Sequence, residues 1–245
     1  MRKFQAIEPS RELIRQVVGE QGGTQPRIDF VRQAERGIKG PGGKLGVFAS
    51  AFDPLTRAHL EIIRRAEQKV DELLLLADRQ NADKQTSFAS LEDRLYMLLE
   101  FFRDQEKVSL GLASHPLFLD KLRALKHAYP PGTSFYFLVG YDTAVRILDR
   151  KYYQDGEAAL EELFRDSQFL VAPRAGRSEE ELTQLFQTPE NKKFRERVHH
   201  LGISDFASSL SSTLAREKLR RGEDVRDLVP EQILKLIKEL KLYGG

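Results

Sequence analysis

Two periodicities of hydrophobic positions organise the chain from residue 44 onward. Apolar runs that predict strands cover residues 44–50, 72–78, 107–113, 134–140 and 168–173, with a weaker one over 198–204. Apolar residues at helical spacing predict helices over 57–70, 90–104, 117–128, 143–150, 212–222 and 229–240. Strands that alternate with helices predict an α/β fold, in which a parallel sheet is covered by helices on both faces.

The first 43 residues differ from this regular pattern. Ser10 is predicted to cap a helix over 11–20, and Pro26 to open a second helix over 27–37. The segment GIKGPGGK (37–44) then reads as a flexible connector. It is not a P-loop, because a leucine stands where that motif needs Ser or Thr, and a strand follows instead of a helix. We therefore expect a helical extension over 1–43 that docks on a domain over 44–245 or mediates self-association, which leaves a homo-oligomer open.

Composition limits which binding partners and which cellular location we expect for the protein. The net charge of +2 gives no reason to expect nucleic acid or a membrane as partner. The chain contains no cysteine, so disulfides and thiolate chemistry are excluded. The first residues, MRKFQAIEPSRELI, lack the apolar core of a signal peptide, and no apolar run approaches the length of a membrane span. We expect a cytoplasmic protein.

The stretch SAFDPLTRAHLEII (50–63) carries the first candidate chemistry. The pair Asp53-Pro54 ends a strand, because proline has no N–H and restricts the residue before it. Thr56 and His59 then fall near the first turn of a helix, on one side of it and beside free backbone N–H groups. Such a position attracts phosphate, and it follows the end of a strand, where ligands of parallel sheets bind.

A second phosphate-binding junction is predicted far downstream. In SLSSTLAREKLRRG, three hydroxyl residues (Ser211, Ser212 and Thr213) precede a helix that carries Arg216. Two such junctions on one sheet would hold the two ends of a polyphosphate. No metal site is predicted: the adjacent His199 and His200 would point to opposite faces of a strand.

Six motifs together resemble a known family. FDPLTRAH is similar to the FDP-(I/V)-(H/T)-x-G-H signature of the nucleotidyltransferase superfamily, and SSTLAR to its ISSTxxR signature. The remaining four are VGYD, VAPRAG, DRLYMLLEF and LRRGEDVRDLVPEQILKLI. In this order they resemble nicotinamide/nicotinate mononucleotide adenylyltransferases from about Lys44 to Leu240, which implies a Rossmann-like nucleotidyltransferase fold.

The resemblance implies roles for ten positions. His59 would stabilise the ATP phosphates during transfer, and Thr56 would contact the same phosphates. Phe52 would line the adenylate site through its backbone, while Gly140 and Asp142 would hold the ATP ribose. Ser212, Thr213 and Arg216 would grip the phosphates at the second junction. Arg174 and Lys84 would lie near the nucleotide base and the mononucleotide phosphate, respectively.

The implied reaction joins ATP, with Mg²⁺ bound to its phosphates, to a mononucleotide. The 5′-phosphate attacks the α-phosphorus of ATP and pyrophosphate leaves, so catalysis is positioning and charge neutralisation. The segment 139–153 is more similar to the branch that prefers nicotinamide mononucleotide. Two alternatives stay open: a phosphopantetheine adenylyltransferase, and a non-catalytic nucleotide-binding or sensing module. Ala49 and Ala58 favour the second alternative, because most members of the family have glycine there.

Overall fold

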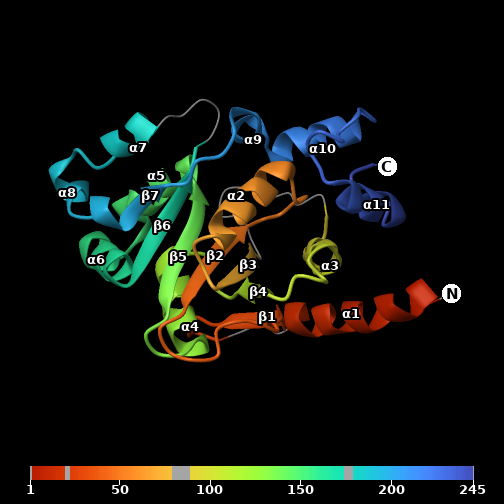
Figure 1. The fold of residues 1–245 in the computed structure, drawn as a ribbon, viewed down its shortest axis with the longest axis horizontal. Coiled ribbons are helices and arrows are strands. Elements are labelled where there is room, and N and C mark those ends of the chain that lie inside the picture. The colour runs from red at the N-terminus through yellow and green to blue at the C-terminus, as the bar shows by residue number, and fades with distance from the viewer. Residues whose placement is uncertain (1, 20–22, 79–88, 174–178, 245) are drawn as a thin grey trace.

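The computed structural model describes residues 2–19, 23–78, 89–173 and 179–244 (Figure 1). Within these residues one seven-stranded sheet has the order β1-β4-β3-β2-β5-β6-β7. The strands are β1 (Ile28–Arg32), β2 (Lys44–Ser50), β3 (Glu72–Asp78), β4 (Val108–Ala113), β5 (Ser134–Gly140), β6 (Ser167–Ala172) and β7 (Val198–His200). All neighbouring pairs are parallel except β1 with β4. The predicted α/β fold with a parallel sheet is confirmed.

Helices connect most of the successive strands, and further helices come after the last strand in the chain. They are α1 (Arg2–Gly19), α2 (Arg57–Glu67), α3 (Leu91–Phe101), α4 (Phe118–Ala128), α5 (Tyr141–Leu148), α6 (Gly156–Asp166), α7 (Glu179–Gln184), α8 (Pro189–Lys192), α9 (Asp205–Ser209), α10 (Ser212–Arg220) and α11 (Glu231–Glu239), with 3₁₀ turns η1 (Arg150–Tyr152) and η2 (Arg195–Arg197). The six helices predicted after residue 44 are all present; α6 to α9 were not predicted. None of the described helices is long and apolar enough to cross a membrane.

Alternation along β3 shows why the sheet is buried on both faces. Leu73 and Leu75 pack in one hydrophobic cluster with α1, α2, α3, α10 and α11, whereas Leu74 and Leu76 pack in a second cluster with α4, α5 and α6. Successive side chains of a strand point to opposite faces, so a continuous apolar run contributes to both cores. A run such as ELLLLAD is therefore a central strand.

Two predictions for the N-terminal segment are wrong. Residues 28–32 form β1, antiparallel to β4, instead of a helix opened by Pro26. Ile28 and Phe30 pack in the second hydrophobic cluster, and the open edge of β4 provides the hydrogen bonds of the ladder, which outweighs the local helical pattern. Ser10 is not a helix cap, because α1 already begins at Arg2. Helix α1 packs on α3, and Ile14 is fully buried there.

A buried carboxylate holds the segment before β2 in place. Glu72, 4% exposed, accepts hydrogen bonds from the Ser109 hydroxyl and the Tyr129 phenol, both at 2.6 Å, and from the Ile38 backbone N–H at 2.7 Å. Burial, and then the neighbouring Glu72 charge, raise the pKa of Tyr129 far above its ordinary value, so its phenol stays a donor. This network lies where β3 begins, at the edge of the sheet opposite the carboxyl ends of the parallel strands.

Candidate functional site

The strand order locates a crevice for ligands. β2 lies between β3 and β5. From β2 the chain first adds β3 and β4 on one side of this strand, and later adds β5, β6 and β7 on its other side, so the strand order reverses at β2. Ligands of open parallel sheets bind beyond the carboxyl ends of the strands at such a reversal. His59 follows β2 and Asp142 follows β5, so the topology brings these two predicted site residues to this point.

His59 is held in a capping box at the start of α2. The Thr56 hydroxyl, whose side chain is 0% exposed, accepts from the His59 backbone N–H at 3.4 Å and contacts His59 Nδ1 at 2.9 Å. The Thr56 backbone N–H donates to the same Nδ1 at 3.0 Å. These contacts fix the ring at the helix start, where the free N–H groups of the first turn favour anions.

The tautomer of His59 follows from these bonds. A backbone N–H can only donate, so Nδ1 accepts and the proton of the neutral imidazole is on Nε2. Nε2 lies 3.5 Å from the hydroxyl of Ser50, which is the last residue of β2. The Nε2–H is thus a donor at the carboxyl edge of the sheet, and it suits a phosphate oxygen.

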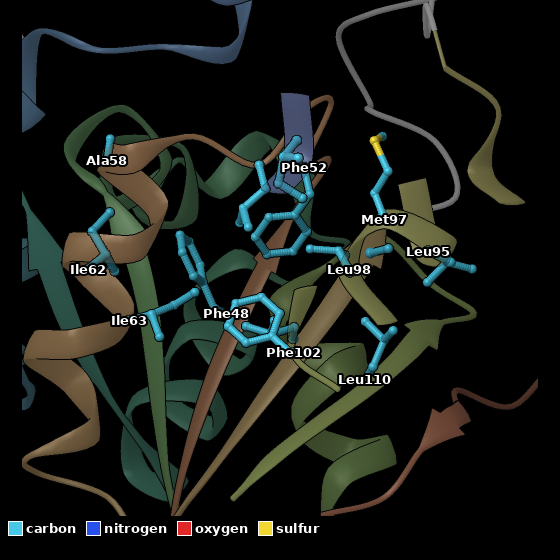
Figure 2. Close-up of a cluster of buried hydrophobic side chains, with 14 of the residues drawn as sticks. Phe48, Phe52, Ala58, Ile62, Ile63, Leu95, Met97, Leu98, Phe102 and Leu110 are labelled. Atoms are coloured by element: carbon cyan, nitrogen blue, oxygen red, sulfur yellow. The ribbon is translucent and has the colours of Figure 1, made fainter. Parts of the chain in front are cut away.

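Aromatic side chains support the loop before α2. The Phe52 ring packs edge-on against Phe48 at 5.4 Å between centroids and lies 5.2 Å from the His59 ring. Figure 2 shows Phe48 and Phe52 between the side chains of α2 and those of α3. Phe52 is 1% exposed and has a φ of 47°, a left-handed conformation that its surroundings must enforce. Any role of Phe52 in a site is therefore through its backbone, as the resemblance implies.

The second junction meets this same loop. Ser211 caps α10 by accepting from the Leu214 N–H at 3.1 Å, and the Ser212 hydroxyl donates to the Pro54 carbonyl at 2.9 Å. The Arg216 guanidinium, 9% exposed, donates to the Asp53 carbonyl at 2.6 Å and to the Thr213 hydroxyl at 3.2 Å. Segments that are about 160 residues apart in the chain are thus directly hydrogen-bonded.

The end of β5 provides an open position beside them. Gly140 is the N-cap of α5, and a Cβ added to it would meet nothing within 4 Å. Its φ of −79° is ordinary, so neither packing nor backbone strain requires glycine there. Asp142 is exposed and lies in the first turn of α5. It does not cap this helix, because the N-cap position is Gly140. This arrangement leaves room for a ligand to approach the backbone next to a carboxylate.

Two predicted site residues, Arg174 and Lys84, lie outside the described residues.

Among the described residues, no group of three or more His, Asp or Glu side chains could hold a metal ion. His199 instead contacts the Gln168 side chain at 2.8 Å, and burial lowers its pKa, with smaller effects from Arg195 and Lys69. Ala58, 9% exposed, packs within the first hydrophobic cluster.

Sequence reasoning missed two residues that hold the loop before α2. The Arg94 guanidinium, 2% exposed on α3, donates to the Ala51 carbonyl at 2.7 Å. The Tyr243 phenol, which follows α11, donates to Asp53 Oδ1 at 2.6 Å. Arg94 stands in the motif DRLYMLLEF, which gave it a sequence signal but no role. Tyr243 lies outside every motif, and its separation of 190 residues from Asp53 leaves no local pattern that could have revealed the contact.

A protein-family model and known proteins are similar to this chain in sequence. The model of the cytidylyltransferase-like family matches residues 47–218. A putative nicotinamide mononucleotide adenylyltransferase of Schizosaccharomyces pombe is 30% identical over 80% of this chain and 85% of its own length. A probable nicotinate-nucleotide adenylyltransferase of Dehalococcoides mccartyi is 28% identical over 82% and 97%, respectively.

The fold also matches solved structures. The nicotinic acid mononucleotide adenylyltransferase of Plasmodium falciparum, solved in complex with NaAD, superposes with a TM-score of 0.59 at 18% identity. The superposition covers 82% of this chain and 97% of that one. The family model spans more than half of this chain, and the yeast relative extends over most of it. The chain therefore belongs to the cytidylyltransferase-like family and, within it, to the nicotinamide/nicotinate mononucleotide adenylyltransferases.

Proposed function

We propose that this chain transfers the adenylyl group of ATP to nicotinamide or nicotinate mononucleotide and releases pyrophosphate. One observation carries the proposal: the starts of α2 and α10 converge, because Ser212 and Arg216 bind the carbonyls of Pro54 and Asp53 directly. Two helix starts that meet at the switch point of the sheet form one anion-binding crevice. The similar proteins are named as adenylyltransferases, and this indicates the class of reaction.

The chemistry needs no protein nucleophile. An oxygen of the 5′-phosphate forms a bond to the α-phosphorus of ATP, the bond from that phosphorus to the bridging oxygen breaks, and pyrophosphate leaves with the electron pair. His59 Nε2–H would donate to a phosphate oxygen where charge increases, and the N–H groups at the start of α2 would add to this. Gly140 and Asp142 would receive the ribose, where a carboxylate accepts from vicinal hydroxyls. Mg²⁺ would enter as part of the ATP substrate.

The positions of Thr56 and Arg216 refine the roles that the resemblance implies. The described contacts of the buried Thr56 hydroxyl are to His59, and Arg216 donates to the loop carbonyl of Asp53. Both side chains would therefore orient the groups that bind phosphate. Direct contact of either with the phosphates stays a prediction, as do the roles of Arg174 and Lys84.

Purified protein incubated with ATP and Mg²⁺ tests the proposal. Separate reactions receive nicotinamide mononucleotide, nicotinate mononucleotide or phosphopantetheine, and both pyrophosphate and the adenylylated product are measured. We expect product with at least one of the two pyridine mononucleotides, and the ratio of kcat/KM values decides which is preferred. The His59→Ala variant should lose most of its turnover, with a measurable residual rate, and still bind ATP. Product with phosphopantetheine alone, or ATP binding without product, would refute the proposal.

A further inference from the structure

The loop between β2 and α2 is held by side chains from three distant parts of the chain: α3, α10 and the segment after α11. Three of its carbonyls accept side-chain hydrogen bonds: Ala51 from Arg94, Asp53 from Arg216, and Pro54 from Ser212. Both arginine residues are buried, at 2% exposure for Arg94 and 9% for Arg216. The loop leads directly into Thr56 and His59, so its position sets the position of the imidazole and of the α2 N-terminus.

Tyr243 adds a side-chain hydrogen bond to the Asp53 carboxylate. Its phenol donates to Asp53 Oδ1 at 2.6 Å, and both residues are buried, at 5% and 4% exposure. Arg216 Nη1 lies 3.9 Å from the other carboxylate oxygen, so Asp53 lies between a phenol and a guanidinium. This pairing explains how a carboxylate remains buried in the loop.

The backbone at both ends of this contact is strained. Phe52, next to Asp53, has a φ of 47°, and Tyr243 has a φ of 61°. Non-glycine residues keep such angles only where the surrounding structure enforces them, and such strain often marks functional sites. Here the phenol–carboxylate bond links the two strained segments. Burial, followed by the Asp53 charge, raises the pKa of Tyr243 far above its ordinary value, so the phenol remains a donor at physiological pH.

We propose that Tyr243 is a positioning residue for adenylyl transfer. It fixes Asp53 and thereby the loop that places His59 and the start of α2 against the ATP phosphates. The inference rests on the proposed function, but its structural part concerns the loop itself and can be tested without turnover. It also gives the segment after α11 a part in the reaction, although that segment lies outside both phosphate-binding motifs.

The chain offers a matched control for this test. Tyr129 also donates its phenol to a buried carboxylate at 2.6 Å, to Glu72, at the opposite edge of the sheet. Tyr243→Phe and Tyr129→Phe thus each remove one phenol–carboxylate hydrogen bond and leave the ring in place. Both variants should lose stability, measured by urea unfolding, but only one of them should change the loop before α2.

Three measurements separate the two variants. Amide hydrogen exchange of the segment 50–57 should be faster in Tyr243→Phe than in wild type and unchanged in Tyr129→Phe. The ATP dissociation constant, measured by calorimetry, should rise in Tyr243→Phe, because a smaller fraction of molecules holds the loop ready. The kcat per folded molecule should fall roughly ten- to a hundredfold in Tyr243→Phe, since small misplacements near a reaction centre have large effects on rate.

The outcomes distinguish a positioning role of Tyr243 in the reaction from a purely structural role. Faster exchange of 50–57 in Tyr243→Phe alone, with a weaker affinity for ATP or a lower kcat, supports the positioning role. Equal behaviour of the two variants in all three measurements would overturn it. If wild-type protein makes no product with any acceptor, the proposed function fails, whereas the exchange measurement still tests whether Tyr243 holds the loop.

Discussion

The contact between Thr56 and His59 leads to the sharpest prediction. The substitution Thr56→Val keeps the shape and volume of a fully buried side chain and removes only its hydroxyl. That hydroxyl caps α2 through the His59 N–H and orients the imidazole through Nδ1. Thr56→Ser is the matched control, because it retains the hydroxyl.

The magnitude follows from the two lost hydrogen bonds. Loss of the cap should destabilise the protein by about 1 kcal/mol. Loss of the bond to the imidazole should add about 1 kcal/mol. For a chain of this size, the sum corresponds to a decrease in Tm of roughly 4–8 °C. If the second bond serves wholly to orient the ring in the transition state, kcat should fall roughly five- to tenfold.

The assay is a double-mutant cycle with His59→Ala, with release of pyrophosphate as the readout. Without the imidazole, Thr56→Val should still lower Tm but should have no further effect on kcat, because Thr56 acts through the ring. Thr56→Ser should retain a kcat near that of wild type. A loss of rate that persists undiminished in the His59→Ala background would refute this reasoning, since it would mean that Thr56 itself contacts the phosphates.

Three further predictions concern stability and substrate binding. Glu72→Gln should lower the free energy of unfolding by about 1–3 kcal/mol, because an amide cannot accept from all three donors around Glu72; an unchanged midpoint of urea unfolding would contradict this. Asp142→Ala should raise the KM for ATP and leave the unfolding transition in place, because Asp142 is exposed; an unchanged KM would argue against contact with the ribose. Burial raises the pKa of Tyr153 to about 12 in the folded chain, from about 10 in an unfolded one. Its contribution to stability is therefore complete below pH about 10 and is lost as the pH rises towards about 12; chemical denaturation across this range measures it, and a flat profile would contradict the sign.

The strands after residue 44 and the helix start at Thr56 could be predicted, because their determinants are local. The run over 72–78 becomes β3 with the same bounds, and a Thr three residues before a His becomes a capping box. The edge strand β1 could not be predicted in this way. Its local pattern predicted a helix, and the exposed edge of β4, about 80 residues away, decides its conformation instead.

The amino-acid sequence by itself determined the α/β fold, the two helix starts proposed to bind phosphate, and the similarity to mononucleotide adenylyltransferases. Periodicity, capping residues and short motifs depend on neighbours within one or two turns, so they can be read along the chain. Only the tertiary structure decided how these parts meet. It directs Arg216 and Arg94 to loop carbonyls and joins Tyr243 to Asp53. Such contacts depend on which surfaces folding brings together, and no local pattern records them.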